Sequence, residues 1–184
     1  MSRTPALACA FAILAVSALA PPAVPQAWAQ PSAAPSAATA PPSAPVPNQP
    51  YGPPVTLDQA KRAMAAAELE AAKNSWQVAI TILDSGGNLV MFHKFDNAQL
   101  SAVTVSEGKA RTALEFKRPS KDLDDAIANG GAGMRLLALK NITPIDGGLP
   151  MVVDGRIIGA IGVSGALSSQ DAQVAKAGAD ALAK

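Results

Sequence analysis

The clearest pattern of apolar and polar residues lies near the C-terminus, where two apolar runs flank a short polar pair. The first run is Leu149 to Val153, the pair is Asp154-Gly155, and the second run is Arg156 to Val163. Asp-Gly between such runs is a strong hairpin signal, because a type I′ turn needs two residues with positive φ. Gly159 and Gly162 interrupt the second run, and glycine in a strand often marks close approach by another backbone or a flat ligand. The pattern therefore predicts a β-hairpin with an unusually smooth surface.

From residue 55 onward, segments with helical periodicity and segments with strand periodicity follow one another. Thr56 and Gln59 fit a capping box, which predicts that a helix begins at Leu57. Pro119 ends a later helix, because proline disfavours helical geometry at the preceding residue, and Ser120 is expected to cap the next one. In order, the pattern predicts a helix at 57–73, strands at 76–83 and 89–93, helices at 101–117 and 120–127, a helical turn at 134–139, a strand at 142–145, the hairpin, and a helix at 170–182 capped by Ser168 or Ser169.

The order of these elements predicts the fold class. Single strands that alternate with helices build parallel sheets, but here the strands are grouped into hairpins. We therefore expect an α+β fold, with an antiparallel sheet of about five strands and helices packed on it. One such domain is expected over residues 55–184.

The N-terminal residues indicate export. Residues 6–20 are apolar, the only nearby charge is Arg3, and Ala27-Trp28-Ala29 resembles a cleavage site, so residues 1–29 are predicted to be a secretory signal peptide. The apolar stretch is shorter than the roughly 20 residues of a membrane span, so no transmembrane segment is expected in the mature protein. The only cysteine, Cys9, lies in the predicted signal peptide, which leaves no disulfide and no thiolate after cleavage. We expect a bacterial periplasmic or secreted protein.

A second N-terminal segment, residues 30–54, consists almost entirely of Pro, Ala and Ser. Proline lacks an amide donor and favours the extended polyproline II conformation. The composition predicts a solvated, disordered spacer. Such a spacer either holds the domain away from a membrane or partner, or is an inert tail.

Charge and motifs argue against several function classes. The chain has 15 Lys and Arg against 14 Asp and Glu, and it lacks the basic run or the aromatic surface that nucleic-acid binding needs. It has one histidine and no Gly-x-Ser-x-Gly elbow, no H-E-x-x-H motif and no paired cysteines. Neither a nucleophile–base pair nor a closed zinc site is indicated. A binding protein is therefore favoured over an enzyme.

An ordered set of short motifs resembles one known family. The motifs are Asp84-Ser-Gly-Gly-Asn-Leu-Val, Gly108-Lys-Ala-Arg-Thr-Ala, Arg118-Pro-Ser, the segment 147–165, Gln170-Asp171, Val174-Ala175 and Ala177-Gly178. In this order they resemble the GlcG/HbpS-like haem-binding family over roughly Val55 to Ala183. The resemblance implies a profilin-like fold with about five strands, haem as the cofactor and assembly into homo-oligomers.

His93 is the candidate ligand for a haem iron, since histidine is a common axial ligand. Relatives usually have a basic residue followed by Met-Asp near this position, whereas this chain has His93-Lys94-Phe95-Asp96, so the resemblance does not assign the ligand. The alternative is a half-exposed histidine at a strand end that binds nothing. Met91, Met134 and Met151 are other soft ligands, although methionine more often fills a core.

A second candidate surface lies on the helix predicted at 101–117. Helical spacing aligns one stripe, made of Ser101, Val105, Lys109 and Thr112. Arg111 lies off this stripe and nearer to solvent. If the stripe faces the hairpin region, with Gly147 and Gly148, it would line a pocket with cationic anchors. Such anchors suit carboxylates, either haem propionates or a small organic acid.

The resemblance also bears on single residues of this surface. It implies that Thr112 contacts haem, because relatives use a threonine in such a position. The alternative for Thr112 is a packed hydroxyl bonded to its own helix. The alternative for Lys109 and Arg111 is a solvated helix face.

Three functions remain open at this point. The first is an exported haem-binding protein that scavenges haem or takes part in redox or haem sensing, with at most weak chemistry from bound iron and an oxidant. The second is a binder or enzyme for a glycolate-type acid, which the resemblance implies because relatives lie near glycolate and diol utilisation genes; Lys109 and Arg111 would orient the acid, and Asp96 would serve as base. The third is an oligomeric scaffold built on the alanine-rich first and last helices.

Overall fold

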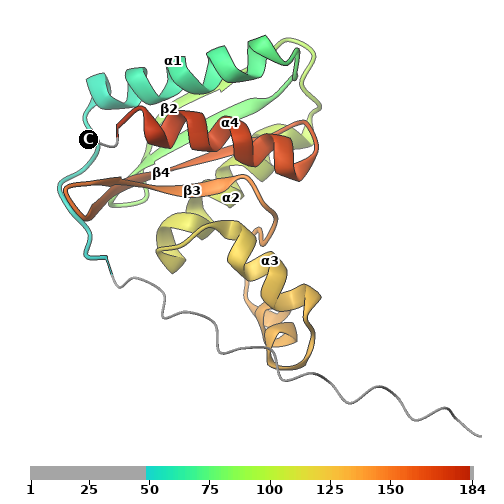
Figure 1. Ribbon diagram of the computed structural model, residues 1–184. Coiled ribbons are helices and arrows are strands. Elements are labelled where there is room, and N and C mark those ends of the chain that lie inside the picture. Colours follow the sequence, from blue (N-terminus) through green and yellow to red (C-terminus); the bar gives the residue numbers. More distant parts are fainter. Residues whose placement is uncertain (1–48, 183–184) are drawn as a thin grey trace, which may run out of the picture. The chain divides into compact units, whose positions relative to one another are not determined.

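The computed structural model describes residues 49–182. The predicted signal peptide at 1–29 and nearly all of the predicted spacer at 30–54 lie outside the described residues. The described part contains α1 (Leu57–Lys73), β1 (Ala79–Asp84), β2 (Leu89–Lys94), α2 (Ser101–Phe116), α3 (Ser120–Ala128), the 3-10 helix η1 (Gly131–Ala138), β3 (Gly148–Val153), β4 (Arg156–Ser164) and α4 (Ser168–Asp180) (Figure 1). Over residues 49–182, no helix is both long enough and apolar enough to cross a membrane.

The strands form one antiparallel sheet with the order β2-β1-β4-β3. Helices α1 and α4 lie next to each other on one face of this sheet, and α2 lies on the other face (Figure 1). Along β1, Ile80 and Ile82 pack into the core beneath α1 and α4, whereas Leu83 packs beneath α2. The predicted α+β fold with an antiparallel sheet is confirmed.

The strand predicted at 142–145 is wrong, so the sheet has four strands rather than about five. The segment is irregular because its backbone groups bond elsewhere. The Thr143 amide donates to Thr112 Oγ1 at 2.7 Å, and Pro144 has no amide to donate. Ile142 lines a groove beside α2 and Ile145 is exposed, so the segment is a loop and does not add a strand.

Two local predictions are confirmed. Thr56 Oγ1 accepts a hydrogen bond from the Gln59 amide at 3.2 Å, and Gln59 Oε1 accepts one from the Thr56 amide at 2.9 Å, which completes the capping box of α1. Asp154 and Gly155 have φ of 50° and 71°. Two successive positive φ angles are what the type I′ turn requires.

The predicted serine caps are wrong. Ser120 is the first residue of α3, and its hydroxyl donates to Ile145 O at 2.6 Å and accepts from the Gly148 amide at 2.9 Å. It therefore ties α3 to the start of β3 instead of capping its own helix. Helix α4 begins at Ser168, two residues earlier than predicted, and neither Ser168 nor Ser169 caps it.

The small-residue faces of α1 and α4 pack within the chain. The predicted stripe of α1 is buried, and its members are Ala60, Met64, Ala67 and Ala71. A Cβ added at Gly178 of α4 would lie 3.0 Å from the Ala63 carbonyl oxygen of α1 and 2.5 Å from Ile161 Cδ1 of the sheet. The close packing that these faces allow is thus used between the two helices and the sheet.

Candidate functional site

The sheet separates the residues singled out from the sequence into two groups. His93 of β2 pairs with Ile80 of β1, and residues directly opposite each other share a face, so His93 lies on the face that carries α1. Lys109, Arg111 and Thr112 belong to α2, on the opposite face. The structure therefore does not bring His93 together with the α2 residues.

Gly147 and Gly148 do meet α2, but its atoms fill the space beside them. A Cβ added at Gly148 would lie 2.2 Å from the Lys109 carbonyl oxygen, and one at Gly147 would lie 2.9 Å from Lys109 Nζ. Gly162 of β4 shows the same relation, with the Ser106 carbonyl oxygen 2.1 Å from an added Cβ. Of the two reasons for glycine in these strands, close approach by another backbone is the one observed. Helix α2 packs directly on the smooth surface that these glycines leave.

Lys109 forms an internal ion pair. Its Nζ donates to Asp171 Oδ2 at 2.8 Å and to the Val163 carbonyl oxygen at 3.0 Å, and the two charged side chains are only 2% and 3% exposed. Burial raises the pKa of the Asp171 carboxyl, although the hydrogen bond and charge of Lys109 oppose this shift. The pair joins α2 to the first turn of α4, and in this arrangement Lys109 does not reach solvent.

Thr112 is also held inside the fold. Its hydroxyl donates to the Gly108 carbonyl oxygen at 2.7 Å and accepts from the Thr143 amide at 2.7 Å. A Cβ added at Gly108 would lie 2.2 Å from Thr143 Oγ1, so the glycine lets the 140–143 loop lie directly on α2. The structure thus agrees with the alternative in which the Thr112 hydroxyl bonds to its own helix.

Arg111 remains partly exposed, with 34% of its side chain accessible, and it donates to Glu107 Oε1 at 3.1 Å. It lines a groove of about 510 Å³ between α2 and the loop after η1. The charged residues of this groove are two acids and two bases, namely Glu107, Glu115, Arg111 and Lys140. These charges balance, so the groove has no net positive charge to attract an organic anion.

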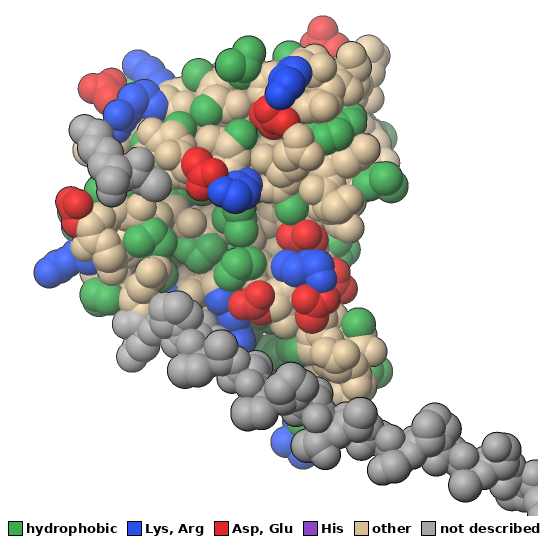
Figure 2. Space-filling model, in the orientation of Figure 1, with side chains coloured by type: hydrophobic (Ala, Val, Ile, Leu, Met, Phe, Trp, Pro, Cys, Tyr) green, Lys and Arg blue, Asp and Glu red, His purple; other side chains and the backbone are tan. Residues whose placement is uncertain are grey.

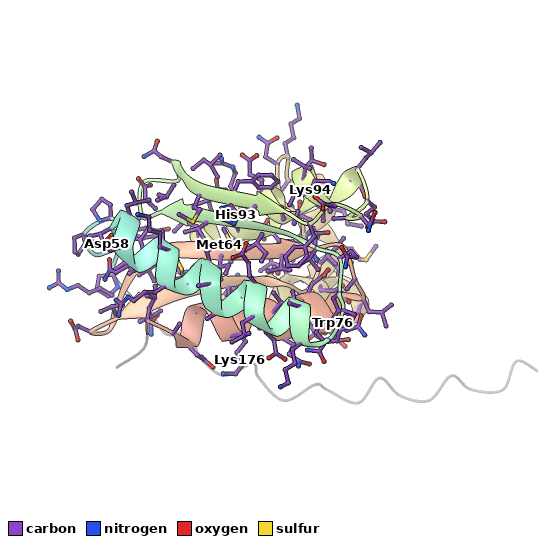
Figure 3. The ribbon with its side chains drawn as sticks, turned by 90° about the horizontal axis from the view of Figure 1, so that it is seen from above. Asp58, Met64, Trp76, His93, Lys94 and Lys176 are labelled. Carbon is purple, nitrogen blue, oxygen red and sulfur yellow. The ribbon has the colours of Figure 1, made fainter. Side chains whose placement is uncertain are left out.

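A second pocket, of about 530 Å³, surrounds His93 at the edge of the sheet. Its lining residues are Glu68, Phe92, His93, Lys94, Phe95 and Asp96. Glu68 of α1 reaches His93, with 2.6 Å between Glu68 Oε1 and His93 Nδ1. Figure 3 shows His93 and Lys94 on β2, next to α1. The pocket therefore combines an imidazole, two aromatic residues, one ammonium group and two carboxylates.

The hydrogen bond to Glu68 defines the chemistry of the imidazole. A neutral histidine has one N–H and one lone pair, and a carboxylate can only accept, so Nδ1 carries the hydrogen. Nε2 then presents its lone pair, and within residues 49–182 no hydrogen bond to Nε2 is seen. Half of the His93 side chain, 49%, is exposed. His93 is thus half-exposed near a strand end, as expected from the sequence, and has one nitrogen open to a ligand.

One imidazole suits only certain metals. In the described part of the chain, no group of three or more His, Cys, Asp or Glu side chains could hold a metal ion. A bare ion at His93 would therefore have fewer than three protein ligands. A haem iron differs, because the macrocycle supplies the equatorial nitrogens and the protein adds an axial one. The donor set at His93 fits haem better than a free cation.

The surface offers no large field of one sign on the face seen in Figure 2. Lys and Arg side chains are interspersed with Asp and Glu there, and hydrophobic side chains gather between them. The interspersed charges follow from exposed ion pairs along the helices, such as Lys121–Asp125 of α3 and Lys176–Asp180 of α4.

Sequence reasoning missed the partners of His93 and Lys109, which are Glu68 and Asp171. Both contact residues that are far away along the chain, at separations of 25 and 62 residues. Helical spacing carried a weak signal for Glu68, because it lies four residues after the buried Met64, at the border of the stripe that faces the sheet. Asp171 lies in the Gln170-Asp171 motif, where a carboxylate close to the start of a helix also has an ordinary role.

Comparison with known proteins gives a consistent match. The family model HbpS-like, described as haem degrading protein HbpS-like, matches residues 55–180. Protein GlcG of Escherichia coli (strain K12) is 44% identical over 110 residues, which covers 60% of this chain and 81% of that protein.

Solved structures agree with this match. The structure of a double mutant of Streptomyces reticuli HbpS has a TM-score of 0.66 and 29% sequence identity, covering 79% of this chain and 98% of that one. The structure of PduOC in complex with heme has a TM-score of 0.64 and 25% identity, covering 70% of this chain and 94% of that one. The family match at residues 55–180 spans all the helices and strands described above.

Proposed function

The chain belongs to the HbpS-like family, whose model spans residues 55–180, and we propose that it binds haem, with His93 as the axial ligand of the iron. The observation that carries the proposal is the half-exposed imidazole, with Nδ1 engaged by Glu68 at 2.6 Å and Nε2 open. The family description, haem degrading, and the heme complex of the PduOC relative support haem as the ligand.

The residues around His93 fit the parts of the cofactor. Phe95 provides apolar surface for a macrocycle, whereas the Phe92 ring packs on the other face of the sheet, against Ala79, Ala98 and Ala102. Lys94 lies opposite Ala79, on the α2 side of β2, and donates only to the backbone carbonyls of Phe95 and Asp96, at 3.2 and 3.5 Å. Its flexible stem must therefore turn around the sheet edge to bring the ammonium to a propionate. When bound, haem supplies redox chemistry; the chain supplies the axial nitrogen, the apolar wall and the cation.

A hemin titration of the purified protein tests this proposal. The wild type should give a saturable Soret change at one haem per chain. His93→Ala should weaken binding by more than about 100-fold, because losing only the hydrogen-bonded support of a ligand already costs about 10- to 100-fold. Arg111→Ala is the matched control on the other face of the sheet and should bind like the wild type. Equal, non-saturating changes of the Soret band in all three proteins would contradict haem binding. Loss of haem binding in Arg111→Ala alone would place the site in the α2 groove.

A small organic acid is the alternative ligand. Assembly into homo-oligomers is a separate prediction. The acid is disfavoured because Lys109 is committed to Asp171 and neither pocket has an excess of cations. The groove at Arg111 also holds Glu107 and Glu115, and the His93 pocket holds Glu68 and Asp96 beside Lys94, so the His93 pocket favours haem through its axial nitrogen. Thermal unfolding with a panel of hydroxy acids tests this alternative, since a ligand that binds only the native state raises its stability. A rise in Tm with one acid, without a hemin response, would favour it over haem.

We further propose that the protein is exported and serves in haem scavenging or in redox or haem sensing outside the cytoplasm. The apolar segment at 6–20 and the Ala27-Trp28-Ala29 site support this. In a bacterial host, the protein should be found in the periplasmic or secreted fraction, with Gln30 as its first residue by N-terminal sequencing. An intact N-terminus in the cytoplasmic fraction would contradict export.

A further inference from the structure

We propose that Glu68 is the positioning residue of the haem site: it fixes the tautomer and the orientation of His93, so that Nε2 is presented to iron. This inference rests on the proposed haem binding by His93. It assigns a role to a residue of α1 that makes no contact with iron itself.

The geometry of the pair supports a defined role. Glu68 lies on helix α1 and His93 on strand β2, so both ends of the hydrogen bond are held by regular elements rather than by loops. The 2.6 Å between Oε1 and Nδ1 is the distance of a direct hydrogen bond to a carboxylate. Without this partner, an exposed imidazole could rotate about its side-chain torsions and carry its hydrogen on either nitrogen.

The same pair has little to contribute to folding. The side chains are 49% and 38% exposed, and ion pairs with such exposure typically contribute between about 0 and 1 kcal/mol. Lys94 and Asp96 line the same pocket, but no hydrogen bond joins either of them to the ring. The Glu68 carboxylate therefore acts mainly on the His93 imidazole, and we expect removal of Glu68 to leave the fold intact.

The chemistry of the pair predicts how it acts on bound haem. A carboxylate that accepts the second N–H of a ligating histidine orients the ring and makes the coordinating nitrogen a stronger donor. A stronger donor favours ferric over ferrous iron, because the ferric ion carries the higher charge. Glu68 should therefore raise the affinity for ferric haem and lower the potential of its one-electron reduction to ferrous haem.

The first test uses the protein without haem. The chain has one histidine, so ¹⁵N–¹H correlation spectra at alkaline pH report His93 alone. The wild type should show the hydrogen on Nδ1. Glu68→Ala should lose this preference, and Glu68→Gln, whose amide oxygen can still accept, should retain much of it. Glu107→Gln removes a carboxylate of similar exposure from an ion pair on the other face of the sheet and should match the wild type.

The second test uses the same proteins with hemin. Glu68→Ala should bind ferric haem about 10- to 100-fold more weakly than the wild type. Glu68→Gln should raise the reduction potential, by 59 mV for each tenfold loss of ferric over ferrous affinity. Unchanged tautomer, affinity and potential in both variants, with haem still lost in His93→Ala, would overturn the role of Glu68 alone. Absence of saturable haem binding by the wild type would overturn the proposed function and this inference together.

Discussion

Replacing Lys109 with methionine is expected to lower the free energy of unfolding by about 3–5 kcal/mol. The substitution removes the Nζ that donates to Asp171 Oδ2 at 2.8 Å and to the Val163 carbonyl oxygen at 3.0 Å. Asp171 is then left as a carboxylate with only 3% exposure and no cation, and an uncompensated buried charge is strongly destabilising. Urea unfolding followed by circular dichroism measures the difference.

Two controls separate the ion pair from a general effect of mutation. Adding Asp171→Ala to Lys109→Met should recover part of the loss, because no buried charge is then left without a partner; the recovery is partial because the Ala166 amide loses its acceptor, Asp171 Oδ1. Lys121→Ala breaks an exposed pair, with 46% and 56% of the side chains accessible, and should cost less than about 1 kcal/mol. If Lys109→Met lowered the free energy of unfolding no more than Lys121→Ala, Lys109 would not be a buried structural cation.

Gly162→Ala is expected to destabilise the protein by about 1–3 kcal/mol, through overpacking between β4 and α2. The added Cβ would lie 2.1 Å from the Ser106 carbonyl oxygen and 2.5 Å from the Ala110 amide nitrogen. Both atoms belong to the backbone of α2, so the whole helix must shift to make room. Thermal unfolding should show a lower Tm in the variant.

Gly86→Ala is the matched control for this prediction. Its added Cβ would meet only side-chain atoms, Asn88 Nδ2 at 3.1 Å and Asp84 Oδ1 at 3.3 Å, in an exposed turn. Side chains there can move aside, so the change in stability should stay within about 0.5 kcal/mol. If Gly162→Ala were as well tolerated as Gly86→Ala, the close packing of α2 against the sheet would be contradicted.

The elements that were predictable from the sequence depend on neighbouring residues. The capping box of Thr56 and Gln59 and the turn at Asp154-Gly155 each use contacts within a few residues, so their signals are complete in the local sequence. The strand predicted at 142–145 failed for the opposite reason. Its apolar character was real, but the bond from the Thr143 amide to Thr112 Oγ1 on α2 decided its conformation.

The candidate site was predictable only in part, because its residues interact over long separations. The sequence identified His93 and left open whether it binds a ligand, and only the pairing of β2 with β1 and the position of α1 reveal its contact with Glu68. Lys109 and Thr112 of the stripe are buried, whereas Ser101 of the same stripe is exposed. The Lys109 ammonium pairs with Asp171 of α4. Hydrophobic periodicity alone does not predict that this helix lies beside α2.

The most direct test of the central claim is whether His93 nitrogen binds the iron. Because the chain has one histidine, protein labelled with ¹⁵N-histidine and loaded with hemin contains a single labelled ligand candidate. Pulsed EPR of the ferric complex should show a ¹⁵N hyperfine coupling from one imidazole, and the coupling should be absent in His93→Ala. Stoichiometric haem binding without any ¹⁵N coupling would contradict the account, because the iron would then be held by another residue.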